Sequence, residues 1–284
     1  MTSKQSGKHK PDNSSKVLSF GEARPDDPVG RGLGEVDLNC DMGEGIGNDV
    51  DIMPFISSAN IACGYHAGDE ETMNRTIELA MQYGVSIGAH PSFPDMENFG
   101  RKEMYLDEQV LYDIIVLQIQ VLDTIAESAG ITIHHVKPHG ALYNMGAKDP
   151  AIAAIIARSV KDIDPSLVFY GLSGSHLINE AKNLGLKTAS EVFADRTYQD
   201  DGSLTPRSQA GALIEVEKQA LQQVLQMIKT GTVQTISGKT IPIIAETICI
   251  HGDGKHAAVF AKKINEVLKA EGIMISSPHR NIGT

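Results

Sequence analysis

Residues 36–44 read VDLNCDMGE, in which alternating apolar residues lead into two carboxylates, Asp41 and Glu44. The alternation is typical of a β-strand, and the Gly-rich stretch that follows is typical of a loop. Further apolar runs ending in polar residues recur along the chain, separated by segments of helical periodicity. These six runs end near Gly64, Ala89, Gly140, Tyr170, Phe193 and Ile250. Seven strands that alternate with helices predict a parallel βα architecture whose strands share one reactive rim at their carboxyl ends.

We therefore expect an α/β fold, a (β/α) barrel that is complete or slightly open, forming a single domain over residues 35–284. Residues 1–34 are rich in Ser, Lys, Gly and Pro and are expected to form a disordered leader. The run at 273–275 is a weaker candidate for an eighth strand.

Composition narrows the class of protein. The formal net charge of −11 over 284 residues argues against a nucleic-acid partner, because the sequence has no basic stripe to replace phosphate counterions. The three cysteines lie inside apolar runs without CxxC spacing, which predicts reduced core thiols and a cytoplasmic protein. No apolar stretch suggests a bilayer span, so no membrane association is expected.

Helical periodicity places helices between the strands. Asp69 and Gly84 are expected to bound one helix, and Asp149-Pro150 to open another over 151–160. The long helix over 107–130 is expected to bury a stripe of Val110, Ile114, Leu117, Val121 and Ile125. Further helices are expected over 176–184, 211–229 and 256–270, with a β-hairpin over 232–244.

Carboxylates and histidines follow the predicted strands. Asp41 and Glu44 lie three residues apart in a Gly-rich turn, where partial burial would separate their pKa values and suit one acid and one base. Equivalent positions after other strands hold His66, His90, His139 and His251. Alternatively, Asp41 is a plain turn residue and Glu44 a helix cap. Four of the ten histidines at strand ends favour a functional rim over packing.

Lys137 and His139 lie two residues apart, so both side chains can face the same side of a strand. A lysine beside a histidine suits polarisation of a carbonyl group with proton transfer, although an ordinary salt bridge is the alternative for Lys137. The arginines Arg196 and Arg207 provide planar forks that match carboxylates and phosphates.

The candidate catalytic residues are Asp41, Glu44, His66, His90, Lys137, His139, Asp195, His251 and Asp253. The candidate substrate-binding residues are Asn39, Asn60, Lys137, Arg196 and Arg207. A divalent metal held by Asp41, His66 and His90 is the main alternative. Because no HExxH signature is present and such residues also serve metal-free acid–base chemistry, we assign no protein-bound metal from the sequence.

Several of these stretches together resemble the LamB/YcsF family, the group of 5-oxoprolinase A subunits. They are residues 37–44 (DLNCDMGE), 58–69 (SANIACGYHAGD), 88–92 (GAHPS), 137–143 (KPHGALY) and 193–196 (FADR). The resemblance runs in order from about residue 35 to about residue 270.

The resemblance implies a (β/α)7-type, TIM-like barrel of the glycoside hydrolase/deacetylase superfamily. It also implies opening of 5-oxo-L-proline to L-glutamate, coupled to hydrolysis of ATP, supplied as its Mg²⁺ complex, and carried out with partner subunits B and C. Two other functions remain open. One is a stand-alone, divalent-metal-dependent deacetylase or amidohydrolase, and the other is a non-catalytic subunit that only binds substrate.

Overall fold

The computed structural model describes residues 34–251 and 257–280, and these form a single α/β domain built on a closed barrel. Seven parallel strands form the barrel: β1 (Glu35–Met42), β2 (Ser58–Ala62), β3 (Ser86–His90), β4 (His135–Val136), β5 (Val168–Leu172), β6 (Lys187–Phe193) and β9 (Thr247–Ile250). Each pairs with the next in this order, and β9 pairs with both β6 and β1, which closes the ring. The predicted barrel is therefore confirmed, in its complete form.

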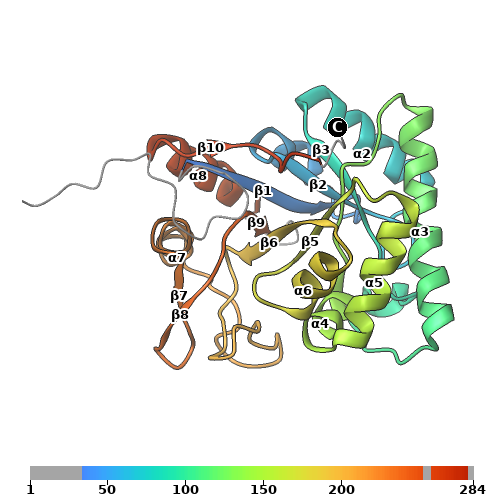
Figure 1. Cartoon of the computed structure of the whole chain (residues 1–284). Coiled ribbons are helices and arrows are strands. Elements are labelled where there is room, and N and C mark those ends of the chain that lie inside the picture. The colour runs from blue at the N-terminus through green and yellow to red at the C-terminus, as the bar shows by residue number, and fades with distance from the viewer. Residues whose placement is uncertain (1–33, 252–256, 281–284) are drawn as a thin grey trace, which may run out of the picture.

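Three further strands lie outside the ring. The run near the C-terminus forms β10 (Met274–Ile275), which pairs with the beginning of β1, at Glu35 and Val36. The predicted hairpin is confirmed as the antiparallel pair β7 (Thr232–Gln234) and β8 (Thr240–Pro242). It lies beside the long segment between β6 and α7, at the bottom of Figure 1.

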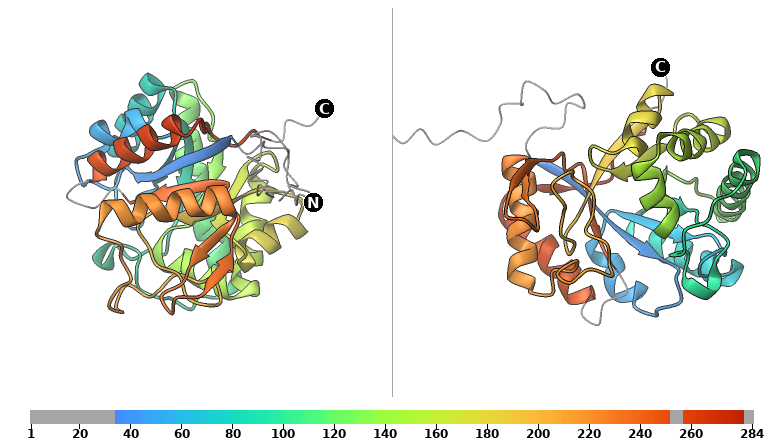
Figure 2. Two further views of the ribbon diagram at one scale, coloured as in Figure 1. Left: turned by 90° about the vertical axis from the view of Figure 1, so that its left-hand side faces the viewer. Right: turned by 90° about the horizontal axis from the view of Figure 1, so that it is seen from below.

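Helices surround the barrel, as the views in Figure 2 show. They are α1 (Asp49–Ile52), α2 (Glu70–Tyr83), α3 (Glu108–Ser128), α4 (Gly140–Lys148), α5 (Pro150–Ile163), α6 (His176–Asn183), α7 (Glu217–Thr230) and α8 (Ala257–Ala270), with short 3-10 turns at Met53–Phe55 and Met96–Asn98. The predicted helix boundaries are confirmed at α2. Asp69 accepts a hydrogen bond from the backbone N–H of Thr72, and Gly84 ends α2 in the left-handed conformation.

Two details of the helix prediction are wrong. In α3 the buried stripe is formed by Leu111, Ile115, Ile119 and Leu122, whereas the predicted Val110, Leu117 and Val121 are exposed. Helix α7 begins at Glu217 rather than near residue 211, because the backbone N–H of Ile214 is bonded to the carbonyl of Asp195 instead. Helix α4, which follows His139 directly, was not predicted.

By length and composition alone, α3 could cross a membrane, and no other helix in the described ranges has both properties. It packs against β3 and between α2 and α5, and it buries one face there, as an outer helix of a barrel does.

The inside of the barrel is polar at its centre. Asp37 accepts hydrogen bonds from Ser57, Ser58 and Thr247 at 2.6–2.7 Å. His135 donates through Nε2 to Asn60 at 2.8 Å. Its ring fits because Gly88 faces it on the neighbouring strand, where a Cβ would lie 2.3 Å from the ring. We call the connected group Asp37, Asn39, Asn60, His135 and Thr247 the interior network.

The predictions for the cysteines and for the N-terminal leader remain. All three cysteines are free and buried, as predicted. The predicted leader at 1–34 lies almost entirely outside the described residues, as does Asp253.

Candidate active site

A cavity of about 440 Å³ opens at the carboxyl ends of the barrel strands. Its inner part is lined by Asp41, Glu44, His90, Lys137 and His139, and its outer part includes Arg101, Tyr143, Arg196, Arg207 and His251. The volume falls in the range of small-molecule sites. The rim that the sequence predicts therefore surrounds one shared cavity.

Lys137 lies at the inner end of this cavity with its side chain only 3% exposed. Its Nζ is 2.9 Å from both Asp41 Oδ1 and Glu191 Oε1, and it also donates to Asn39 Oδ1 at 3.1 Å. Burial opposes the charged form, but the carboxylates of Asp41 and Glu191 outweigh it and hold the pKa of Lys137 well above its usual value. Lys137 is thus a buried ammonium group with two carboxylate partners.

Asp41 is held in place from three sides. Its Oδ1 accepts hydrogen bonds from Lys137 and from Asn60 Nδ2, at 2.9 and 2.8 Å. Its Oδ2 lies 3.3 Å from His90 Nε2. Burial raises the pKa of Asp41, but His90 and Lys137 together outweigh burial and hold the pKa well below the usual value. Asp41 is therefore an ionised, oriented carboxylate.

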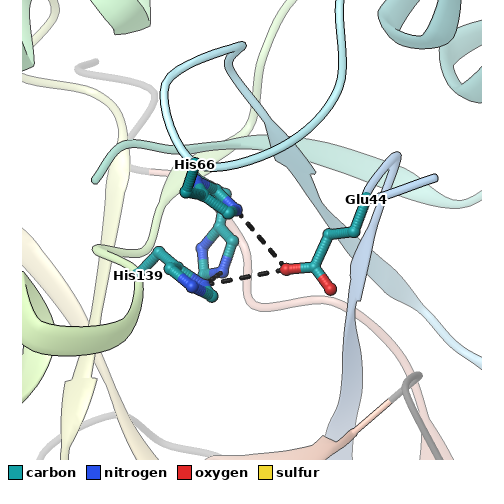
Figure 3. A group of neighbouring side chains, drawn as sticks. Glu44, His66 and His139 are labelled. Atoms are coloured by element: carbon teal, nitrogen blue, oxygen red, sulfur yellow. Dashed lines mark hydrogen bonds and ion pairs between the residues drawn. The ribbon is translucent and has the colours of Figure 1, made fainter. Parts of the chain in front are cut away.

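Glu44 points toward His66 and His139 (Figure 3), and His90 joins them beside Asp41. We call Glu44, His66, His90 and His139 the rim cluster, and one ligand-type atom from each lies within 4.8 Å of the others. Glu44 Oε1 is 3.4 Å from His66 Nε2 and 3.7 Å from His139 Nδ1. The rings of His66 and His139 stack with their centroids 3.8 Å apart.

The outward hydrogen bonds of the rings define which nitrogen carries the proton in each neutral histidine. His90 Nδ1 donates to the Lys137 carbonyl at 2.7 Å, and His139 Nε2 donates to the Phe99 carbonyl at 2.9 Å. Ser92 donates its only hydroxyl proton to the Phe93 carbonyl, so its Oγ accepts from His66 Nδ1 at 2.9 Å. The remaining nitrogen of each ring faces the centre of the cluster, where His139 Nδ1 and His90 Nε2 are at hydrogen-bond distance, 2.9 Å apart.

Burial keeps two of these rings neutral. It lowers the pKa of His139 to about 3 and that of His66 still further, and the neighbouring histidines act in the same direction. The loop that carries Phe99 lies close against His66 and His139 because Gly100, at φ 65°, has no side chain. A Cβ at this position would lie 2.9 Å from atoms of both histidine side chains. The rim cluster is therefore a set of nitrogen and oxygen donors that could hold a metal ion.

On the other side of the cavity, Asp195 binds His251. Asp195 Oδ1 and Oδ2 lie 2.8 and 3.0 Å from His251 Nδ1. Burial opposes the Asp195 charge, but His251 outweighs it and lowers the pKa of Asp195. An aspartate that orients a histidine at the edge of a cavity is an arrangement suited to proton transfer.

Arg196 supplies a buried cation to the cavity wall. It donates to the carbonyls of Thr205 and Ala212, is only 6% exposed, and makes no ion pair within the ranges that the structure describes. Burial and the nearby charge of Arg207 lower the pKa of Arg196. Arg207 is exposed at the mouth, so the two arginines mark one side of the cavity for an anion.

Two other predicted residues lie deeper in the barrel. Asn39 and Asn60, predicted to bind substrate, lie below the cavity instead and bond Lys137, Asp41 and Glu191. Sequence reasoning missed Glu191, although an acidic residue inside the apolar run of β6 was an available signal. It also missed Tyr143, whose hydroxyl is buried near Glu191, where burial and that carboxylate raise its pKa well above the usual value.

Comparison with known proteins finds relatives that this chain matches over nearly all of their own length. Residues 36–282 match the LamB/YcsF family. Two proteins named as the A component of 5-oxoprolinase, from Tolumonas auensis and Brevibacillus brevis, are 54% and 52% identical to this chain, covering 86% and 85% of it and 100% and 97% of their own lengths. The crystal structure of the lactam utilization protein from Thermus thermophilus superposes with a TM-score of 0.80 at 38% identity, covering 85% of this chain and 99% of that one.

Proposed function

Because this chain belongs to the LamB/YcsF family, we propose that it is the hydrolytic A component of an ATP-dependent 5-oxoprolinase, which opens 5-oxo-L-proline to L-glutamate. The observation that carries the proposal is the buried Lys137–Asp41 pair at the inner end of a cavity whose wall holds Arg196. In a small lactam with one carboxylate, the carboxylate can bind the arginines on one side of the cavity. The amide carbonyl can then face Lys137.

The reaction breaks the ring C–N bond and forms a C–O bond with water. A lactam is a resonance-stabilised amide, and phosphorylation of its carbonyl oxygen by ATP would make the carbon open to attack. Arg196 and Arg207 bind the substrate carboxylate. Lys137 neutralises charge on the phosphorylated carbonyl oxygen, and Asp41 orients the attacking water and accepts its proton. When the C–N bond breaks, the phosphoryl group stays on the new carboxyl group as an acyl phosphate, and a second water releases it as phosphate.

The leaving nitrogen must take up a proton as the ring opens. His251 is the group we assign to this step, since it lines the cavity and Asp195 holds its Nδ1. This leaves Nε2 to exchange the proton, as in other Asp–His pairs. The amino group of glutamate is then released in place of the ring nitrogen.

We assign ATP and its Mg²⁺ to the partner subunits B and C, because the sequence contains no GxxxxGK[ST] phosphate loop. A reducing, cytoplasmic setting fits the three free cysteines.

A reconstituted assay tests the proposal. Glutamate release from 5-oxo-L-proline is expected to require this chain, subunits B and C, ATP and Mg²⁺ together. The substitution Asp41→Asn is expected to lower kcat by about 10²- to 10⁴-fold, whereas Glu108→Gln, in an exposed ion pair with Arg158, leaves kcat unchanged. Equal turnover by this chain alone without ATP would contradict the proposal. Full activity of Asp41→Asn with substrate binding retained would favour a binding role instead.

A further inference from the structure

We propose that Glu44, His66, His90 and His139 form a binding site for one divalent transition-metal ion, with Zn²⁺ as the expected ion. The proposal goes beyond the proposed reaction and does not depend on it, because bound metal is measured directly.

Distances within the cluster fit a shared ion. Nitrogen and oxygen ligands lie about 2.0–2.2 Å from Zn²⁺, so two ligands of one ion are separated by roughly 3–4.4 Å. Glu44 Oε1 is 3.4 Å from His66 Nε2 and 3.7 Å from His139 Nδ1. His139 Nδ1 is 2.9 Å from His90 Nε2, just below the lower limit. Three imidazoles and one carboxylate are a ligand set that suits zinc.

The outer hydrogen bonds are those of metal-binding histidines. Such histidines donate their second N–H to a carbonyl, a carboxylate or another oxygen, which fixes the ring and directs the other nitrogen at the metal. Here the acceptors are the carbonyl oxygens of Lys137 and Phe99 and the hydroxyl oxygen of Ser92. All three rings are therefore oriented for one ligand before it binds.

A proton shared between two rings does not explain the whole cluster. A doubly protonated His90 would donate Nε2–H to His139 Nδ1 and remove the repulsion between those two lone pairs. It would leave His66 Nε2, which is buried without a hydrogen-bond partner in the described ranges, facing the Glu44 carboxylate at 3.4 Å. A metal ion satisfies all three nitrogens and the carboxylate at once.

Charge points the same way. Asp41, Glu44 and Glu191 bring three formal negative charges to the inner end of the cavity, and Lys137 brings one positive charge. A divalent ion bound at the rim cluster would bring two positive charges to this negative region. When bound, such an ion would lower the pKa of a bound water and polarise a carbonyl oxygen.

Metal loading of the full chain tests the proposal without any assay of activity. The protein is freed of metal with a chelator, incubated with Zn²⁺ or Co²⁺ and desalted, and the metal is counted by mass spectrometry. We expect about one ion per chain, a visible absorption band for the cobalt form, and a thermal midpoint that rises by several degrees on loading. His66→Gln is expected to lose at least tenfold in affinity.

The matched control is His251→Gln, a rim histidine bonded to Asp195 outside the cluster, which should load metal as the natural chain does. Circular dichroism of His66→Gln separates loss of a ligand from loss of the fold. If His66→Gln does not fold, absorption of the cobalt form of the natural chain still decides, because nitrogen ligation gives a band that aqueous Co²⁺ lacks. A folded natural chain that retains no metal, or a folded His66→Gln that binds as tightly, would overturn the proposal.

Discussion

The interior network and the rim cluster are both buried, both contain histidine, and differ in how their polar atoms are matched. In the interior network each acceptor meets a donor: Thr247 donates to Asp37 and accepts from Asn39, and Asn60 joins Asn39 to His135. In the rim cluster, ring nitrogens of three histidines and the Glu44 carboxylate converge on one point. Matched buried groups make a rigid support, whereas a gathering of nitrogen and oxygen ligands suits the cation proposed above. Lys137 connects the two regions, since it bonds Asn39 on one side and Asp41 on the other.

Removing this connection should have the largest effect. Lys137→Met leaves Asp41 and Glu191 as buried carboxylates without their shared cation, and breaking such a pair costs about 3–5 kcal/mol. We expect the free energy of unfolding, measured with urea, to fall by about that amount. The control Lys262→Met breaks an exposed pair with Glu266 at 4.0 Å and should change it by less than about 0.5 kcal/mol. Similar losses in both variants would show that Lys137 does not support the site.

The fit of the interior network can be tested at Gly88. Gly88→Ala places a methyl group where it would lie 2.3 Å from the His135 ring, and overpacking of this kind costs about 1–3 kcal/mol. The double variant Gly88→Ala with His135→Ala should be less destabilised than the sum of the single variants. Additive losses in a double-mutant cycle of urea unfolding would contradict direct contact between the two residues.

The interior histidine should also make stability depend on pH. Burial, and then the nearby His134, hold the pKa of His135 well below the ordinary 6.5. Below about pH 6.5 the unfolded chain therefore takes up a proton that the folded chain does not, and stability falls as the pH falls. We expect about 1 kcal/mol of this loss per pH unit from His135. In His135→Gln the slope between pH 7 and pH 5.5, measured from urea unfolding, should be shallower by that amount, and an unchanged slope would refute it.

The smallest effect is expected outside both regions. Deleting residues 1–32, before β1, should leave the thermal midpoint, metal loading and reconstituted activity unchanged, because the segment has too little apolar surface to offset the entropy of ordering it. Limited proteolysis should remove it first. A midpoint several degrees lower would mean that the segment packs on the barrel.

The sequence predicts the barrel well because each strand is a short apolar run and each helix has a capping residue or a terminal glycine. It does not predict the buried face of α3, since apolar residues such as Leu117 and Val121 also lie on the exposed side of this helix. For the site, position at a strand end was enough to find the rim histidines. Their grouping was not predictable, because Glu44 reaches them through a loop that turns at Gly43, with φ 69°. Asp41 consequently pairs with Lys137, and Glu44, not Asp41, completes the three-histidine set.

The order in which a ribosome makes this chain bears on when the cavity can exist. The first strand, β1, is closed on one side by β9, and the bond between Asp37 and Thr247 spans 210 residues. Until Thr247 leaves the exit tunnel, β1 has an unpaired edge, although every rim-cluster residue has already been synthesised. At roughly 5–20 residues per second, the chain spends many seconds in this state. A nascent chain stalled before β9 should therefore expose β1 to chaperones or to other chains. Errors in late translation would yield aggregation-prone fragments instead of partly active ones.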